Sequence, residues 1–137
     1  MAELSRIEIV KLIATPNRRG KEHQISLSGV DLSNIDLTMC VFVGTNFEGA
    51  NLNDANLKGT NLEGAILVRA DLEGANLTNA NLTKADLISA ILEDTNLDRA
   101  NLKYANLVGT NLKGVNLEGA YFEGISKNKI MERKFWI

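Results

Sequence analysis

A large apolar residue stands at every fifth position through most of this 137-residue chain. From Leu27 to Phe122, each fifth residue is Leu or Phe without exception. This spacing does not follow one face of an α-helix, whose apolar positions recur at alternating steps of three and four residues. A continuous β-strand does not fit either, because its period of two would send every second Leu to the opposite face. The chain must therefore change direction within each five-residue unit.

The residues around each Leu or Phe centre indicate how the chain turns. Two positions before the centre stands a small or β-branched residue such as Ala50, and between them stands usually Asn or Asp, such as Asn51. Ten of the eleven glycines occupy the second position after the centre, where a type II turn needs a positive φ. Each unit is therefore predicted to be three strand-like residues and a two-residue turn.

A chain that turns the same way in every unit coils into a solenoid, whose coils stack about 4.8 Å apart. The small residue and the centre face the lumen, and the Asn or Asp between them faces water. This reasoning fixes neither the number of units per coil nor the handedness. The predicted core centres in the most regular part of the chain are Leu52, Leu57, Leu62, Leu67, Leu72, Leu77, Leu82 and Leu87.

Units such as ANLKG (55–59), TNLEG (60–64) and ADLEG (70–74) resemble the A(D/N)LXX motif of the pentapeptide repeat family. The resemblance covers residues 25–124 as twenty consecutive units. It implies an all-β fold, a right-handed quadrilateral β-helix with four units per coil, and so five coils over roughly 24 Å. The first four units, from ISLSG to CVFVG, carry larger residues at the small position, so the first coil is expected to be the least regular.

An open solenoid exposes unpaired backbone and core at both ends, and both ends need caps. Residues 1–24 are expected to form the N-terminal cap. Ser5 and Glu8 have capping-box spacing, and Pro16 disfavours helical geometry just before it. These signals predict a short helix over about residues 6–14, with a strand as the alternative.

Residues 125–137 break the repeat and carry Ile130, Met131, Phe135 and Trp136. This segment is expected to fold across the last coil as a C-terminal cap. Some members of the family pair through their C-terminal ends, so the resemblance leaves a dimer formed by this segment as the alternative to a monomer.

Composition narrows the possible functions and locations. The net charge of −2 provides no bulk attraction to nucleic acid or to a membrane surface. The single cysteine, Cys40, fits a reducing compartment. The first residues lack the features of a signal peptide, and no apolar run approaches the roughly 20 residues that span a bilayer. A cytoplasmic protein without membrane association is expected.

No residue pattern indicates catalysis, a cofactor or a metal ion. The one histidine, His23, lies in the polar stretch NRRGKEHQ without ligand or nucleophile spacing around it. Cys40 occupies the small inward position, which favours a buried inert thiol. The glycines recur as turn residues and do not form a phosphate-binding loop between a strand and a helix. The protein is therefore predicted not to be an enzyme.

The outward positions carry the remaining information. With four units per coil, residues twenty apart stack, so Asn56, Asn76, Asn96 and Asn116 form a surface column that predicts an amide ladder. Apolar residues also stand at outward positions. The candidate protein-interaction patch consists of Ile66, Val68, Ile88, Ile91 and Val108. A patch of this kind marks a partner site on a soluble protein, and the alternative is tolerated drift of the repeat.

Two functional hypotheses follow. The leading one is a protein-interaction or scaffold module with an unidentified protein partner and no direct nucleic-acid binding. The alternative, implied by the resemblance, is DNA mimicry toward DNA gyrase or another topoisomerase. Residues 25–124 carry 13 acidic and 6 basic residues, whereas 24 Å of duplex DNA carries about 14 charges. The net charge of −7 over this length, 13 acidic residues less 6 basic ones, is about half the charge of DNA, which favours the first hypothesis.

Overall fold

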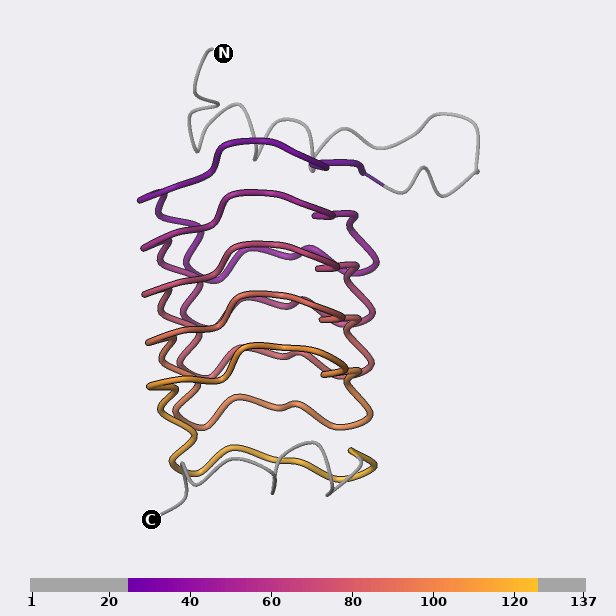
Figure 1. The fold of residues 1–137 in the computed structure, drawn as a ribbon, viewed down its shortest axis with the longest axis vertical. Helices are drawn as coiled ribbons and strands as arrows, with labels where there is room; N and C mark the ends of the chain where they lie inside the picture. Colours follow the sequence, from indigo (N-terminus) through magenta and orange to yellow (C-terminus); the bar gives the residue numbers. More distant parts are fainter. Residues whose placement is uncertain (1–24, 126–137) are drawn as a thin grey trace.

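Residues 25–125, described by the computed structural model, form a solenoid of stacked coils (Figure 1). Sixteen isolated parallel β-bridges join outward residues twenty positions apart, from Ser26–Asn46 to Asn101–Tyr121. Among residues 25–125 there is no helix, and no strand is longer than these single-residue bridges. Each coil therefore contains four units, and the strand-like triplet predicted from the sequence shortens to one bridging residue.

The predicted N-terminal cap, with its helix over 6–14, lies outside the described residues, as does the C-terminal segment from residue 126. Ile125, which the sequence assigns to the C-terminal cap, is described. Its N–H donates to the carbonyl oxygen of Phe122 at 3.2 Å, and its side chain packs against the core. The hydrogen bonding of the repeat therefore continues into this residue.

The four units of each coil form four faces, numbered here along the chain. Face 1 holds residues 25–29, 45–49, 65–69, 85–89 and 105–109; face 2 holds the units that follow these, and faces 3 and 4 the next two sets. In the unit 50–54, Ala50 is the small residue, Asn51 the outward residue, Leu52 the centre, Asn53 the first turn residue and Asp54 the corner residue.

Backbone hydrogen bonds join each coil to the next. The N–H of Leu52 donates to the carbonyl oxygen of Asp71 at 2.7 Å, and the N–H of Asp71 donates to the carbonyl oxygen of Ala50 at 3.0 Å. At the corner, the N–H of Asp54 donates to the carbonyl oxygen of Glu73 at 2.9 Å. Because this set recurs along the stack, one coil fixes the register of the next.

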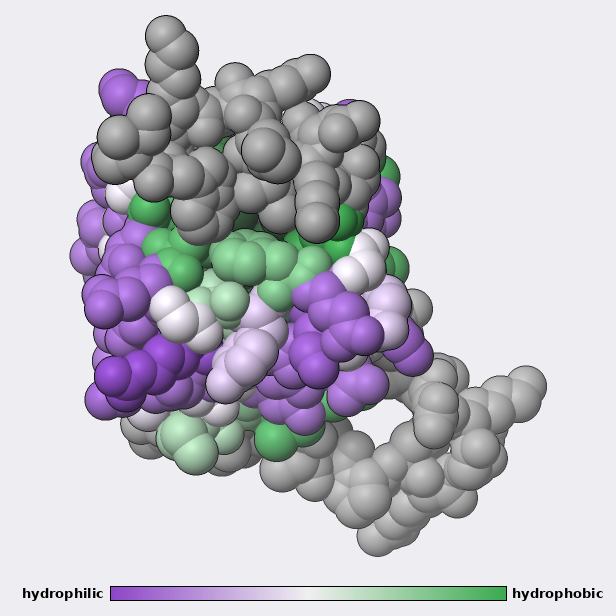
Figure 2. Space-filling model, turned by 90° about the horizontal axis from the view of Figure 1, so that it is seen from below, coloured by the Kyte–Doolittle hydropathy of each residue, from purple (hydrophilic) through white to green (hydrophobic). Residues whose placement is uncertain are grey.

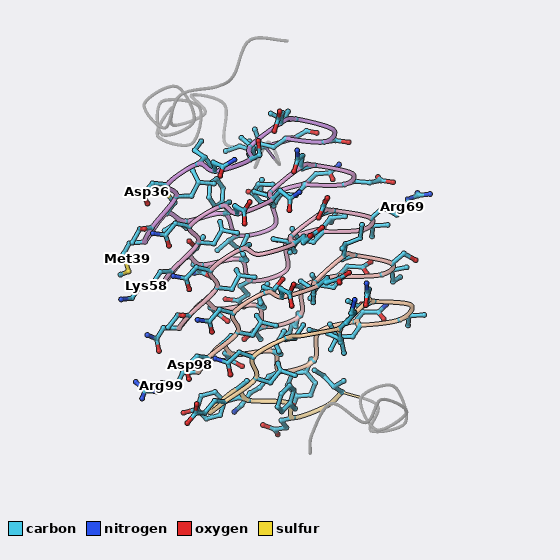
Figure 3. All side chains as sticks on the ribbon, turned by 60° about the vertical axis from the view of Figure 1, so that its left-hand side comes forward. Asp36, Met39, Lys58, Arg69, Asp98 and Arg99 are labelled. Atoms are coloured by element: carbon cyan, nitrogen blue, oxygen red, sulfur yellow. The ribbon has the colours of Figure 1, made fainter. Side chains whose placement is uncertain are left out.

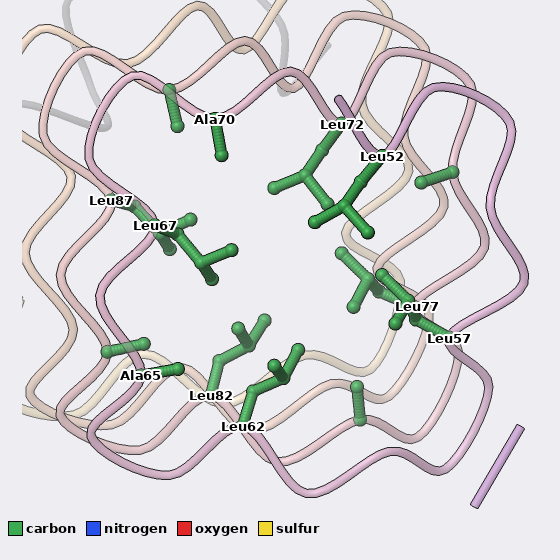
Figure 4. Packing of buried hydrophobic residues seen from close by; sticks show 14 of the residues in the cluster. Leu52, Leu57, Leu62, Ala65, Leu67, Ala70, Leu72, Leu77, Leu82 and Leu87 are labelled. Atoms are coloured by element: carbon green, nitrogen blue, oxygen red, sulfur yellow. The ribbon is translucent and has the colours of Figure 1, made fainter. Parts of the chain in front are cut away.

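The lumen is filled by the centres and the small residues (Figure 4). All eight predicted core centres from Leu52 to Leu87 are buried, and so are the alanines between them. Four buried threonines take the place of alanine, and three of them donate their hydroxyls to backbone carbonyls, as Thr95 does to Leu72 at 2.7 Å. In the described region no buried side-chain nitrogen or oxygen lacks a hydrogen-bond partner.

The first coil differs from the others in its filling. Its small positions hold Ile25, Val30, Ile35 and Cys40, which are only partly buried. The rings of Phe42 and Phe47 meet edge to face, with centroids 5.1 Å apart. At the other end, the apolar interior becomes accessible: Leu117 and Phe122 are partly buried, and apolar side chains are visible on the C-terminal end in Figure 2.

Every corner residue has a positive φ, between 54° and 74°. Ten of the twenty are glycines, as the type II turn requires, and the other ten are L-residues that include Met39, Lys84 and Tyr104. The N–H after each corner donates to the preceding centre, as from Ala55 to Leu52 at 3.0 Å. Four of these ten are Asn or Asp, which tolerate the left-handed region, and each of the other six carries backbone strain of roughly 1–2 kcal/mol.

Candidate functional site

Most outward residues stabilise the turn of their own unit. The Oδ1 atom of Asn76 accepts a hydrogen bond from the N–H of Thr78 at 3.1 Å, and Asp71 does the same for Glu73 at 3.0 Å. This Asx turn recurs at nearly every unit with Asn or Asp at the outward position. The outward Asn or Asp is therefore primarily a structural residue of the repeat.

The predicted Asn column is assembled on face 3. Parallel bridges join Asn56 to Asn76, Asn76 to Asn96, and Asn96 to Asn116. Within this column, a side-chain bond between coils is formed from Asn116 Nδ2 to Asn96 Oδ1, at 3.1 Å. Each of the four Oδ1 atoms accepts from the N–H of its own turn. The column consequently consists of stacked Asx turns with a local amide contact.

Ile66 and Ile91 interrupt the pattern of Asx turns. Ile66 bridges Asn46 and Asp86 on face 1, and Ile91 bridges Asp71 and Asn111 on face 2. An isoleucine side chain has no oxygen to accept the N–H of its turn, so each of these units loses one hydrogen bond that its neighbours make. The backbone bonds between coils persist, since the N–H of Ile66 donates to Thr45 at 3.0 Å.

Val68, Ile88 and Val108 stack as first turn residues of face 1. The N–H of Gly49 donates to the carbonyl oxygen of Val68, that of Arg69 to Ile88, and that of Ser89 to Val108, at 2.8–2.9 Å. Val108 has 38% of its surface exposed, and Val68 and Ile88 are half-buried. Three apolar side chains therefore lie in line, parallel to the axis of the solenoid.

The structure brings the five predicted residues to one corner, between faces 1 and 2. Ile66 precedes Val68 on face 1, and Ile91, which is 38% exposed, follows Ile88 around the corner on face 2. We call these five residues, Ile66, Val68, Ile88, Ile91 and Val108, the corner patch. None of them fills the lumen, so the repeat does not need their apolar character.

The most exposed apolar residues of the described region lie elsewhere. Met39 is 71% exposed, Val41 and Val43 are more than half exposed, and so are Tyr104 and Tyr121. Val41 and Val43 were recognisable from the sequence as apolar residues at outward positions. The others occupy outward or corner positions too, so the same register would have identified them. Met39 and Tyr104 are corner residues, and each lies over a glycine of the next coil, Gly59 and Gly124 respectively.

Ion pairs on the surface link successive coils. Arg69 contacts Glu48 at 3.0 Å, and Lys113 contacts Glu93 at 3.0 Å. In Figure 3, Arg69 projects on the side away from Met39, Asp98 and Arg99. The hydrogen bond to Glu93 and the charge of that carboxylate raise the pKa of Lys113 above its ordinary value. Arg69 and Lys113, the two basic residues on faces 1 and 2, therefore both form ion pairs with glutamates of the same chain.

Within residues 25–125, two carboxyl groups have lowered pKa values. The backbone N–H of Ser33 donates to Asp31 at 3.0 Å and lowers the pKa of that carboxyl. A hydrogen bond from Lys103, at 3.1 Å, lowers the pKa of Glu123. Both groups lie on the surface and their partners belong to turns or to the neighbouring coil, so these shifts report structural contacts.

The described residues contain no arrangement of three or more His, Cys, Asp or Glu side chains that could hold a metal ion. Cys40 is a free thiol, half-buried at the small position of the first coil. In this part of the chain, no helix has the length and apolar character needed to cross a membrane. The corner patch is consequently the candidate functional site.

Comparisons with known proteins identify the repeat. The chain matches the family described as "Pentapeptide repeats" in eight copies, over residues 25–64, 55–94, 65–103, 80–119 and 95–126. None of the curated proteins compared matches the chain.

Several solved structures are similar to this chain. A pentapeptide repeat protein from the thylakoid lumen of Arabidopsis thaliana is 39% identical, with a TM-score of 0.66, over 68% of this chain and 65% of that one. HetL, a pentapeptide repeat protein involved in heterocyst differentiation regulation in the cyanobacterium Nostoc, is 32% identical, with a TM-score of 0.45, over 72% of this chain and 53% of that one. A trypsin-treated QnrB1, a plasmid-mediated fluoroquinolone resistance protein, is 23% identical, with a TM-score of 0.43, over 74% and 49%. The chain spans less than two thirds of each of these proteins.

Proposed function

The chain belongs to the pentapeptide repeat family, whose members form right-handed β-helices, and we propose that it is a non-enzymatic protein-interaction module. The observation that supports this function is the corner patch. Its five apolar side chains gather at one corner from positions that the repeat elsewhere fills with Asn, Asp, Ser, Thr, Glu or Lys, apart from Val41, Val43 and Tyr121. Apolar side chains gathered on the outside of a soluble protein are typical of a surface that binds another protein.

The solenoid is suited to presenting such a surface without rearrangement. Backbone hydrogen bonds join the units of Ile66, Val68, Ile88 and Ile91 to the coils on both sides, and the centres beneath Val68 and Ile88, Leu67 and Leu87, are fully buried. A preorganised surface loses little conformational entropy when a partner binds. Binding through the corner patch therefore needs no change in the fold.

The proposal is tested with the variant Val68→Glu/Ile88→Glu. Glu48 stands at the first turn position of the same column, so the fold accepts glutamate there. As a matched control, Thr78→Glu/Thr83→Glu places the same charges at the same positions of faces 3 and 4. Tagged full-length protein is used to capture partners from the native cell, and thermal melting checks the fold of each variant.

We expect the partner captured by the wild-type protein and by the control to be lost from Val68→Glu/Ile88→Glu, with unchanged melting temperatures. If the folded patch variant captures the same partner as well as the wild type does, the corner patch is not the binding surface and the proposed function is wrong.

DNA mimicry is the second candidate function, supported by the uneven distribution of acidic residues. Faces 1 and 2 carry eight acidic residues against two basic ones, whereas faces 3 and 4 carry five against four. A supercoiling assay with a purified type II topoisomerase tests this function. Inhibition by protein at about equimolar concentration would favour mimicry, and unaffected supercoiling at excess protein would remove it.

A further inference from the structure

The direction and the charge of the corner patch together indicate what kind of partner it fits. We propose that it binds a basic amphipathic helix of another protein, which lies parallel to the solenoid axis and turns its Lys and Arg residues toward face 2. This inference rests on the proposed function and makes it more specific. It is carried by the spacing of the apolar column and by the charges beside it.

The spacing of the column matches a helix. Val68, Ile88 and Val108 belong to three successive coils, which places the outer two about 9.6 Å apart along the axis. On a helix, residues i and i+7 lie about 10.5 Å apart on the same face, with i+3 or i+4 between them. Side chains on one face of an extended strand recur about every 6.6 Å. This distance matches neither the spacing of about 4.8 Å between neighbouring coils nor the roughly 9.6 Å across two coils. An apolar column of this length therefore favours a helix over an extended peptide.

The charges beside the patch favour a basic helix. On face 2, Asp71 bridges to Ile91 of the patch, and Glu73 and Asp94 stand farther along the same face, toward face 3. On face 1, Asp86 stands between Ile66 and Asn106 in the outward column. None of these four carboxylates forms an ion pair with a described residue. The acidic residues of faces 1 and 2 are Asp31, Glu48, Asp54, Asp71, Glu73, Asp86, Glu93 and Asp94.

The basic residues on the same two faces do not offset this charge. Arg69 contacts Glu48, which lies in the same column as Val68. Lys113 contacts Glu93 on face 2 and also interacts with the charges of Asp94 and Glu73. Each base is thus paired with a glutamate of its own chain, and the eight acidic residues of faces 1 and 2 still outnumber these two basic ones. Complementary charge of this kind sets the orientation and the association rate of a partner.

The test measures binding of a synthetic fluorescent peptide to the full-length protein by anisotropy. The probe is a helical peptide of Leu, Ala and Lys with leucines at i, i+4 and i+7 and lysines along one flank. Two control peptides have the same composition in scrambled order, or Glu in place of Lys. The protein variants are Ile88→Thr, which shortens the apolar column, and Asp71→Asn/Glu73→Gln, which removes charge. Glu63→Gln/Glu118→Gln removes two charges from faces 3 and 4 as the matched control.

We expect the probe to bind the wild-type protein more tightly than both control peptides. Ile88→Thr and Asp71→Asn/Glu73→Gln should each weaken binding about fivefold or more, the second with a reduced dependence on salt, and the matched control should bind like the wild type. No binding of the probe, or equal loss in the face 1–2 and face 3–4 variants, overturns the inference.

Sedimentation velocity of the same proteins identifies a different occupant. If the wild-type protein is a dimer that Ile88→Thr dissociates, a second copy of the chain covers the patch and the proposed helix does not. The proposed function has a separate outcome. If partner capture depends on Val68 and Ile88 but the probe does not bind, the protein is an interaction module whose partner is not a basic helix.

Discussion

The ring of Tyr104 lies against Gly124, one coil further along the same corner, and fills the space that a β-carbon of Gly124 would need. The same relationship recurs at the other corners, where the side chain of Asp94 covers Gly114 and that of Met39 covers Gly59. A glycine in these columns therefore has two functions: it adopts the positive φ of the turn, and it leaves room for the corner residue of the preceding coil.

The two functions can be separated by comparing Gly124→Ala with Gly64→Ala. Both glycines belong to the corner between faces 4 and 1, with φ of 74° and 64°, but a β-carbon on Gly64 would meet no atom within 4 Å. Gly64→Ala should lower the free energy of unfolding by the backbone term alone, about 1–2 kcal/mol. Gly124→Ala should lower it by roughly 1 kcal/mol more, because the tyrosine ring must leave its rotamer.

Urea denaturation of both variants measures the difference. In the double variant Tyr104→Gly/Gly124→Ala the extra loss should disappear, since the ring is absent. Equal losses for Gly124→Ala and Gly64→Ala would show that the ring moves aside without cost.

Lys84 offers a test of the strain at corners that lack glycine. Its φ is 58°, and Lys84→Gly should remove roughly 1–2 kcal/mol of backbone strain against an entropic loss of about 0.5–1 kcal/mol. A net stabilisation of about 0.5–1 kcal/mol is expected in urea denaturation. Lys58→Gly is the matched control, because Lys58 is a first turn residue without a positive φ; this change should destabilise the protein. Stabilisation by both changes, or by neither, would contradict the strain argument.

The fold was predictable because each position of the repeat has one physical requirement. The period of five identified the buried centres, and the glycines identified the corner position, where all twenty described residues have positive φ. The number of units per coil required the family resemblance. The residues of one unit do not determine how many units make a coil. The bridges between residues twenty positions apart show that the number is four.

The candidate site was predictable in part, from register alone. Once twenty residues make a coil, Val68, Ile88 and Val108 must stack, and Ile66 and Ile91 must stand on adjacent faces. The sequence did not indicate that outward Asn and Asp residues are used mainly by their own turns, because the amide ladder and the Asx turn need the same residue types. The cost of Ile66 to its turn became evident only from those hydrogen bonds.

Replacing Ile66 with Asn should stabilise the protein and weaken partner binding. The new Oδ1 can accept the N–H of Val68 as Asn46 accepts that of Glu48 at 2.8 Å, a gain of about 0.5–1.5 kcal/mol. The reverse change on face 3, Asn56→Ile, should lose a similar amount, because Asn56 accepts the N–H of Lys58. Chemical denaturation measures both changes. A stabilised Ile66→Asn protein that loses its partner would indicate that function retains the isoleucine; unchanged capture of the partner would indicate tolerated drift of the repeat.

Acid stability should depend on Asp31. Its pKa lies below the ordinary value of 3.8 because the backbone N–H of Ser33 donates to the carboxylate. Between the lowered folded pKa and 3.8, the unfolded chain binds more protons than the folded one, so stability rises with pH. The contribution is complete above pH 3.8 and is lost as the pH falls through the folded pKa.

Ser33→Pro removes the donor at a turn position that accepts proline, and should return the pKa of Asp31 toward its ordinary value in a carbon-13 NMR titration. Asp31→Asn retains an acceptor for the turn and should remove this part of the pH dependence in denaturation experiments. If the titration of Asp31 is the same in Ser33→Pro as in the wild type, the hydrogen bond from Ser33 is not the cause of the shift.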